Sequence, residues 1–89
     1  MSRSLDHAIC RADRLRRLVE LLKSSQDAVV LAVASHDLTQ YVKYGGDKAK
    51  QTVTDLGGKT RVMELMSHEN GDVRYQALMT VQRLMSQHI

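Results

Sequence analysis

Four residues in the second half of the chain, Gly57-Gly58-Lys59-Thr60, are of types that could bind a phosphate group. In a phosphate-binding loop, backbone amides cradle the phosphate oxygens and a lysine neutralises their charge. The full pattern needs another glycine five positions before its Gly-Lys-Thr, where this chain has Val53. It also needs a preceding strand, where we expect a helix. The end of one helix and the start of the next explain both glycines, so nucleotide binding is not predicted.

A metal site is the second kind of chemistry to consider. His7 and Cys10 lie three positions apart, on one face of an expected helix. A structural zinc site needs four ligands, and the chain has one cysteine. The other histidines, His36, His68 and His88, are scattered. We therefore interpret His7 as a surface residue and Cys10 as a half-buried thiol, and we predict no metal and no cofactor.

Acid–base chemistry could involve Asp37, which follows a histidine. It lies four positions after Val33 and four before Tyr41, on an apolar line of an expected helix. A carboxylate buried there must be paired, because burying an isolated charge is costly. A structural acid would cap a neighbouring helix or pair with a base such as Lys59 or Arg61. With no nucleophile or second acid nearby in sequence, we predict that Asp37 is a structural buried acid and that the chain is not an enzyme.

A basic cluster could indicate nucleic-acid binding. It consists of Arg11, Arg14, Arg16 and Arg17, in a chain whose formal net charge is +3. A nucleic-acid interface usually has a longer basic stripe or stacking aromatic residues. Aromatic residues make up only 3% of this chain, so we interpret the cluster as a solvated or protein-contact face and predict no nucleic-acid partner.

Methionines are concentrated near the C-terminus, where they could fill the core or line an adaptable contact surface. Met66 and Met85 fit the inner apolar stripes of their expected helices. Met63 and Met79 are expected to be partly exposed.

Helices are expected to position all of these residues. Apolar residues recur at helical spacing over residues 5–23, and Asp27 is the expected N-cap of a second helix that reaches about Tyr44. Its first part, residues 28–34, is apolar on every side, which predicts a central helix covered all round. Gly45-Gly46 ends it, and Asn70-Gly71-Asp72 forms a later turn and cap. The remaining helices are expected at about residues 47–56, 59–67 and 73–87.

Composition sets limits on the class of protein. The 89 residues fit a single domain, 1–89, and the absence of proline, phenylalanine and tryptophan argues against an all-β fold. We predict an all-α domain of about five helices. A single cysteine favours a reducing compartment. The longest apolar run, seven residues, is far shorter than a membrane span, and the first residues do not resemble a signal peptide.

A repeat is visible when the chain is shifted by 43 residues, a period within the range of HEAT and armadillo repeats. Both copies read as a helix, a polar loop containing serine and a longer helix. We therefore predict two repeat units of a right-handed helical solenoid, as a C-terminal domain or fragment of a longer subunit. The coinciding pairs are Val19 and Val62, Leu22 and Leu65, Val30 and Val73, Ala34 and Ala77, Leu38 and Val81, Tyr41 and Leu84, and Val42 and Met85.

Several blocks of sequence carry a family resemblance. They are Leu31-Ala32-Val33-Ala34-Ser35-His36-Asp37-Leu38 with Tyr41-Val42, Leu56-Gly57-Gly58-Lys59 with Val62-Met63, and His68-Glu69 with Val73-Arg74-Tyr75-Gln76-Ala77-Leu78 and Val81-Gln82-Arg83-Leu84-Met85. In order and nearly in spacing, the chain resembles the C-terminal domain of the H subunit of the vacuolar-type proton ATPase (V-ATPase) from about Leu18 to Met85.

The resemblance implies a non-catalytic subunit domain built of HEAT/armadillo-like helices. It implies that the domain bridges the soluble ATPase sector to the membrane sector and restrains ATP hydrolysis in the free soluble sector. The implied partners are other V-ATPase subunits, in the soluble sector and the stator, with no direct membrane insertion. The implied location is cytoplasmic, peripheral on the cytosolic face of endomembranes. The alternative is a generic helical-repeat adaptor that binds another protein.

The expected contact surface follows from the positions of the loops, because loops held by a rigid scaffold are common contact points. We expect a loop of Lys23, Ser24, Ser25 and Gln26, together with Arg74, to meet the partner. Both flank the long helices at one end of the array.

Overall fold

The fold consists of helices joined by short turns. The computed structural model describes residues 3–86, with side chains described for residues 13–86. The helices are α1 (Arg3–Ser24), α2 (Ala28–Asp55), α3 (Gly58–Leu65) and α4 (Gly71–Met85), and no strand occurs within the described residues. The all-α prediction is confirmed.

The helix starts follow from local side-chain chemistry. The Asp27 carboxylate accepts hydrogen bonds from the amides of Val29 and Val30, at 2.8 and 3.4 Å, so it caps α2 as predicted. Asn70 caps α4 in the same way, accepting from the amides of Asp72 and Val73. Each cap satisfies amides that have no partner within the first turn.

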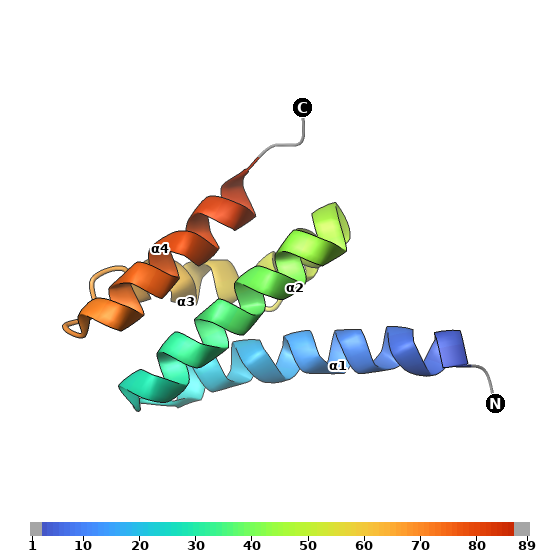
Figure 1. Ribbon diagram of the computed structural model, residues 1–89, viewed down its shortest axis with the longest axis horizontal. Helices are drawn as coiled ribbons and strands as arrows, with labels where there is room; N and C mark the ends of the chain where they lie inside the picture. The colour runs from blue at the N-terminus through green and yellow to red at the C-terminus, as the bar shows by residue number, and fades with distance from the viewer. Residues whose placement is uncertain (1–2, 87–89) are drawn as a thin grey trace.

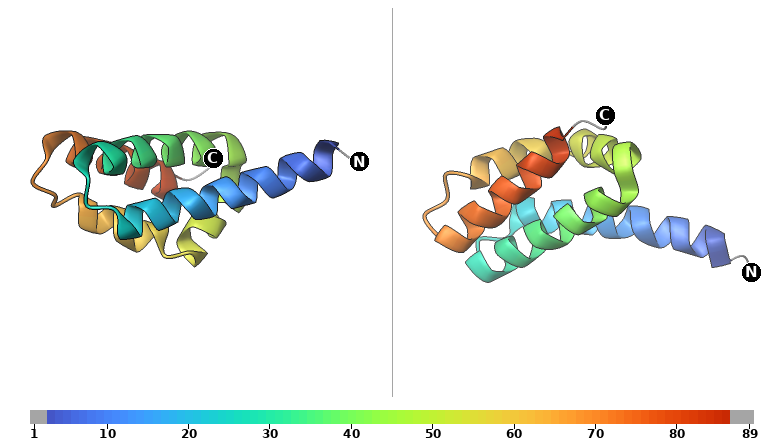
Figure 2. Two further views of the ribbon diagram at one scale, coloured as in Figure 1. Left: turned by 90° about the horizontal axis from the view of Figure 1, so that it is seen from below. Right: turned by 45° about the horizontal axis from the view of Figure 1, so that its top comes forward.

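A kink at Gly46 divides α2 into two helical segments. Gly46 has φ 68° and ψ −148°, a conformation that residues with a Cβ rarely adopt. A Cβ on the preceding Gly45 would lie 2.6 Å from the Cβ of Ala49, so this position also requires glycine. The break predicted at Gly45-Gly46 is confirmed, and the chain after it turns back toward the C-terminal end of α1 (Figure 2).

The helices form two pairs that lie against each other, α1 with α2 (the first pair) and α3 with α4 (the second pair). Helix α2 contacts α1, α3 and α4, whereas α1 contacts α3 and, within the described residues, not α4. The first segment of α2 and the whole of α4 lie side by side and run in the same direction (Figure 1). The N-terminal turns of α1 project away from the other helices (Figures 1 and 2).

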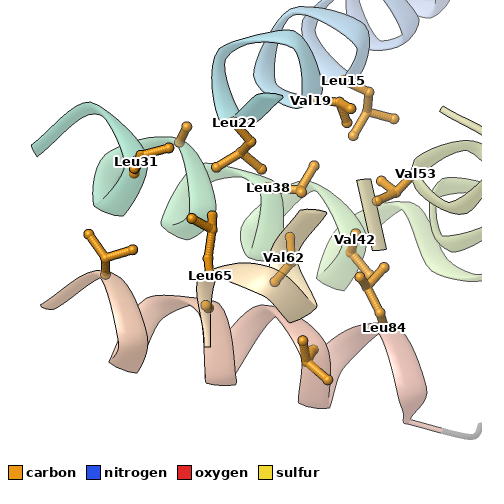
Figure 3. Packing of buried hydrophobic residues seen from close by; sticks show 14 of the residues in the cluster. Leu15, Val19, Leu22, Leu31, Leu38, Val42, Val53, Val62, Leu65 and Leu84 are labelled. Atoms are coloured by element: carbon orange, nitrogen blue, oxygen red, sulfur yellow. The ribbon is translucent and has the colours of Figure 1, made fainter. Parts of the chain in front are cut away.

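One apolar core joins the two pairs. Leucine and valine side chains from all four helices meet between α1, α2 and α4, with α3 closing the far side (Figure 3). Gly58 lets the start of α3 lie close to Val53 of α2, because a Cβ on Gly58 would lie 2.8 Å from a methyl carbon of Val53. Four of the seven pairs related by the 43-residue shift are buried in both copies: Val19 and Val62, Leu22 and Leu65, Ala34 and Ala77, and Leu38 and Val81.

The prediction that the start of α2 is covered all round is wrong. Val29 and Val33 are exposed, Val33 by 54%, because α1, α3 and α4 pack against the other sides of the helix. The prediction that Asp37 is a structural buried acid is wrong for the same reason. The buried stripe passes through the neighbouring Leu38, and Asp37 lies on the solvent side with Val33.

Candidate protein-contact surface

The α1–α2 connection and the α3–α4 connection lie at the same end of the molecule. The α1–α2 connection is residues 25–27, and the α3–α4 connection is residues 66–70. Figure 1 shows both at the end where α2 and α4 begin. The predicted loop differs in part, because Lys23 and Ser24 form the last turn of α1. The Ser24 hydroxyl donates to the Glu20 carbonyl at 2.8 Å, one turn back.

A hollow of about 350 Å³ lies beside the α1–α2 connection. The four residues of the predicted contact loop line this hollow on one side. The start of α3 forms the opposite wall. Its lining is Lys23, Ser24, Ser25, Gln26, Gly57, Thr60, Arg61 and Glu64.

Two cations hold the walls of this hollow together. The Lys23 Nζ donates to the Leu56 carbonyl at 2.9 Å, and the Arg61 Nε donates to the Leu22 carbonyl at 2.6 Å. Both carbonyls belong to helix C-terminal ends, where a positive charge is favourable. Lys23 crosses directly over Gly57, where a Cβ would lie 3.2 Å from the Nζ. Lys23 therefore joins α1 to the C-terminal end of α2, and Arg61 joins α3 to α1.

The serines and the glutamine differ in how far the fold uses them. The Ser25 hydroxyl accepts a hydrogen bond from the Asp27 amide at 3.1 Å, which shapes the turn. Gln26 is exposed, and its side chain makes no hydrogen bond to another described residue that we observe. A partner that enters this hollow can contact Gln26 without breaking an internal bond.

Arg74 lies in a second hollow at the same end of the molecule, of about 360 Å³. Its guanidinium donates to the carbonyls of His68 and Glu69, at 2.9 and 3.0 Å, and so fixes the α3–α4 connection. The hollow is lined by Met66, Gly71, Arg74, Tyr75 and Leu78. The predicted contact residues therefore share one end of the molecule but divide between two hollows of different character, the first polar and the second largely apolar.

Among the side chains that the structure describes, the other chemical candidates do not assemble into a reactive site. Gly57-Gly58-Lys59-Thr60 forms the N-cap and the first turn of α3, so a helix and not a strand precedes it, and Gly57 is a left-handed cap with φ 84°. Over residues 13–86, no three His, Cys, Asp or Glu side chains gather as a metal centre requires. The side chains of His7, Cys10 and Arg11 lie outside the described ones.

The basic cluster on α1 is partly engaged within the fold. Arg14 donates to the Tyr41 hydroxyl at 3.1 Å, and Arg17 lies 3.6 Å from a carboxylate oxygen of Asp13. Arg16 and Arg17 are exposed. The helices described here include none with the length and apolar content needed to cross a membrane.

Burial of the methionines differs from prediction. Met63 is half exposed, as expected, but Met85 is 59% exposed and Met66 is 37% exposed rather than inside. These two follow the helical spacing of the core yet are exposed. For Met85 the available signal is its spacing from Tyr75 and Leu78, which are also exposed on α4.

Similarity to known proteins agrees with the resemblance seen in the sequence. The family model that describes the H subunit of the V-ATPase matches residues 7–89. The H subunit of the V-type proton ATPase of Drosophila melanogaster is 46% identical over 71 residues, which cover 80% of this chain and 15% of that protein. A probable H subunit of the V-type proton ATPase of Oryza sativa is 47% identical over 70 residues, 79% of this chain and 15% of that protein.

A third relative, the second of two probable H subunits of the V-type proton ATPase of Caenorhabditis elegans, is 46% identical over 68 residues, 76% of this chain and 14% of that protein. The chain thus spans about 15% of the length of these curated relatives. At this identity, over most of its own length, the chain belongs to the H-subunit family of the V-ATPase.

Proposed function

We propose that this chain is a non-catalytic regulatory and structural part of a proton-pumping ATPase. In this role it binds other subunits of the pump, bridges the soluble and membrane sectors, and restrains ATP hydrolysis when the soluble sector is free. The observation that carries the proposal is the identity of about 46% with proteins named as the H subunit of the V-type proton ATPase. Its location would be the cytosolic face of endomembranes, held there by the complex.

The scaffold we propose is a pair of HEAT/armadillo-like units in a right-handed solenoid. In such arrays each helix pair stacks on the next, so helices of equal rank become neighbours. The contacts of α1 with α3 and of α2 with α4 support this arrangement, as does the shared direction of α2 and α4 in Figure 1. The repeated buried positions, such as Leu22 and Leu65, support it further.

The contact surface we propose for the pump is the end that carries Lys23, Ser24, Ser25, Gln26 and Arg74. Its polar hollow exposes hydroxyl and amide groups that can bind a partner's backbone or charged side chains. The surrounding helix ends are fixed by Lys23 and Arg61, so a partner meets a preformed surface.

The test measures binding of the purified chain to a free soluble ATPase sector from which the resident H subunit has been removed. Gln26→Glu and Lys23→Glu are each expected to weaken binding by about tenfold if the hollow meets the partner. Lys48→Glu is the matched control, because it makes the same charge change as Lys23→Glu at an exposed site near the kink, away from this end.

Each variant also needs a thermal melt, since Lys23→Glu removes the bond to the Leu56 carbonyl. Gln26→Glu keeps the test decisive even when the lysine variant is destabilised. Wild-type binding with unchanged affinity for both variants would remove this hollow from the contact. Absence of any binding to the soluble sector would leave the alternative, an adaptor for another protein.

A further inference from the structure

The outer face of the second helix pair is apolar and uncovered. Of nine large apolar side chains that are exposed among residues 13–86, five lie on α3, its C-terminal cap and α4. Met66, Tyr75 and Leu78 line the same hollow. Met63 lies three positions before Met66 and Met85 seven positions after Leu78, so helical spacing places each on the same side of its helix. We call this surface the outer face; it consists of Met63, Met66, Tyr75, Leu78, Gln82 and Met85.

The repeat shows what covers the same positions in the first pair. Shifting back by 43 residues places Leu78 on Ser35 and Met85 on Val42. Both equivalents in α2 are buried, Ser35 fully and Val42 to 1% exposure, because α4 packs over them. Figure 3 shows Val42 facing Leu84 of α4. The outer face thus continues, at equivalent positions, a helix-covered surface already present within the molecule.

Polar contacts show how α4 is aligned along the covered surface of α2. Gln82 corresponds to Thr39, whose hydroxyl lies 2.7 Å from the hydroxyl of Thr80 in α4. The Thr80 hydroxyl also lies 3.0 Å from the Ser35 carbonyl. In the first pair, therefore, α4 is held over the stripe of α2 that contains Ser35 and Thr39. The equivalent stripe of α4 in the second pair is exposed.

The spacing on α4 specifies the shape of the occupant. Gly71, Tyr75, Leu78, Gln82 and Met85 are separated by four, three, four and three residues. This is the seam spacing by which one helix packs along another, each side chain entering a gap between side chains of its partner. Met66, at the C-terminal cap of α3, also lines the hollow, and its flexible side chain can adapt to those of a partner.

The charge around the groove specifies the chemistry of the occupant. Among the described residues, Arg74 is the only charged one that lines the hollow. Lys59 precedes Met63 by one helical turn and so lies on the same side of α3. A helix with carboxylates beside its apolar seam would complement these two cations.

We propose that the outer face binds an amphipathic helix of another protein, with an apolar seam in the groove and acidic residues along its flanks. This goes beyond the proposed function, because the hollow on the outer face shares only Arg74 with the proposed pump contact and its test requires no ATPase subunit. Binding follows the helix-in-groove mode, in which anchors from consecutive helical turns enter one groove.

The test uses two synthetic helical peptides of about three heptads with leucine at both seam positions. One has glutamate at the flanking positions, and the other has lysine there. Fluorescence anisotropy measures the binding of each to the full chain. We expect the glutamate peptide to bind at least about tenfold more tightly than the lysine peptide.

Variants of the outer face locate the binding. Leu78→Glu is expected to weaken binding of the glutamate peptide at least about tenfold, as removal of a central anchor does. Val33→Glu is the matched control, since Val33 is also an exposed aliphatic residue and lies on a separate face, on α2. If Leu78→Glu lowers the helical content, Tyr75→Glu replaces it, because Tyr75 is more exposed.

Three results would overturn the proposal. The first is absence of binding by the glutamate peptide, and the second is equal binding by the lysine peptide. The third is an equal loss from Val33→Glu and the outer-face variants. Sedimentation equilibrium adds a further outcome: self-association that Leu78→Glu abolishes would assign the face to a second copy and also overturn the proposal.

Discussion

The two helix pairs have the same core and different surfaces. Val19 and Leu22 of α1 match Val62 and Leu65 of α3, although α1 has 22 residues and α3 has eight. The second helices of the pairs differ on one side. Ser35 and Val42 of α2 are covered, whereas Leu78 and Met85 at the equivalent positions of α4 are exposed. Core packing therefore sets how the two pairs stack. The surface that remains exposed after stacking is available for binding.

The largest effects test the shared core. Leu22→Ala and Leu65→Ala should each lower the free energy of unfolding by about 2–5 kcal/mol, because both side chains are buried and leave a cavity. Urea denaturation measures both values. A loss below about 1 kcal/mol for Leu65→Ala alone would show that the second pair does not share the packing of the first.

The kink in α2 should be the next most sensitive feature. Gly46→Ala is expected to lower the free energy of unfolding by about 1–3 kcal/mol, through backbone strain at positive φ. No atom within 4 Å would meet the added Cβ, so crowding contributes nothing. Gly71→Ala is the control, since φ is not positive there and the nearest atom would be 3.5 Å away. Equal melting temperatures for Gly46→Ala and the wild type would contradict the kinked geometry.

The polar contact between the pairs should have a smaller effect. Thr80→Val removes the buried hydroxyl that meets Thr39 and the Ser35 carbonyl, at an expected cost of about 1–2 kcal/mol. Ser35→Ala provides a contrast, because the Ser35 hydroxyl is buried without a partner among the described residues. Its removal should be neutral or slightly stabilising. Chemical denaturation of both variants compares them, and a greater loss for Ser35→Ala would reverse the assignment.

The smallest predicted difference lies between two aspartates, one that caps α2 and one within it. Asp27→Ala should cost about 1 kcal/mol, since the carboxylate caps two amides. Asp37→Ala should change stability by less than about 0.5 kcal/mol, because Asp37 is exposed. Thermal melts at one pH separate the two. A large loss of stability from Asp37→Ala would contradict the exposed position of Asp37 and would favour the buried acid predicted from the sequence.

Local features were predictable from sequence because each depends on a few neighbouring residues. The cap at Asp27, the cap at Asn70 and the break at Gly46 all follow from side-chain chemistry or backbone freedom within one turn. Four of the seven pairs related by the 43-residue shift are buried in both copies, which supports the proposed repeat.

Burial on a particular side was less predictable, because it depends on which neighbours a helix has. Asp37 and Met85 both lie at helical spacing from apolar residues, yet each falls on a side that no described helix covers. The residues proposed for contact lie at one end of the molecule, but the division of Lys23 and Arg74 between two hollows follows from the placement of α3. That placement arises from long-range packing.

The most direct test of the proposed role is the ATP hydrolysis rate of a free soluble ATPase sector, titrated with this chain. The account predicts that hydrolysis falls as the chain is added and that Gln26→Glu requires a higher concentration for the same inhibition, whereas Lys48→Glu behaves as the wild type. A rate that stays constant while the chain binds at saturation would contradict the restraining role.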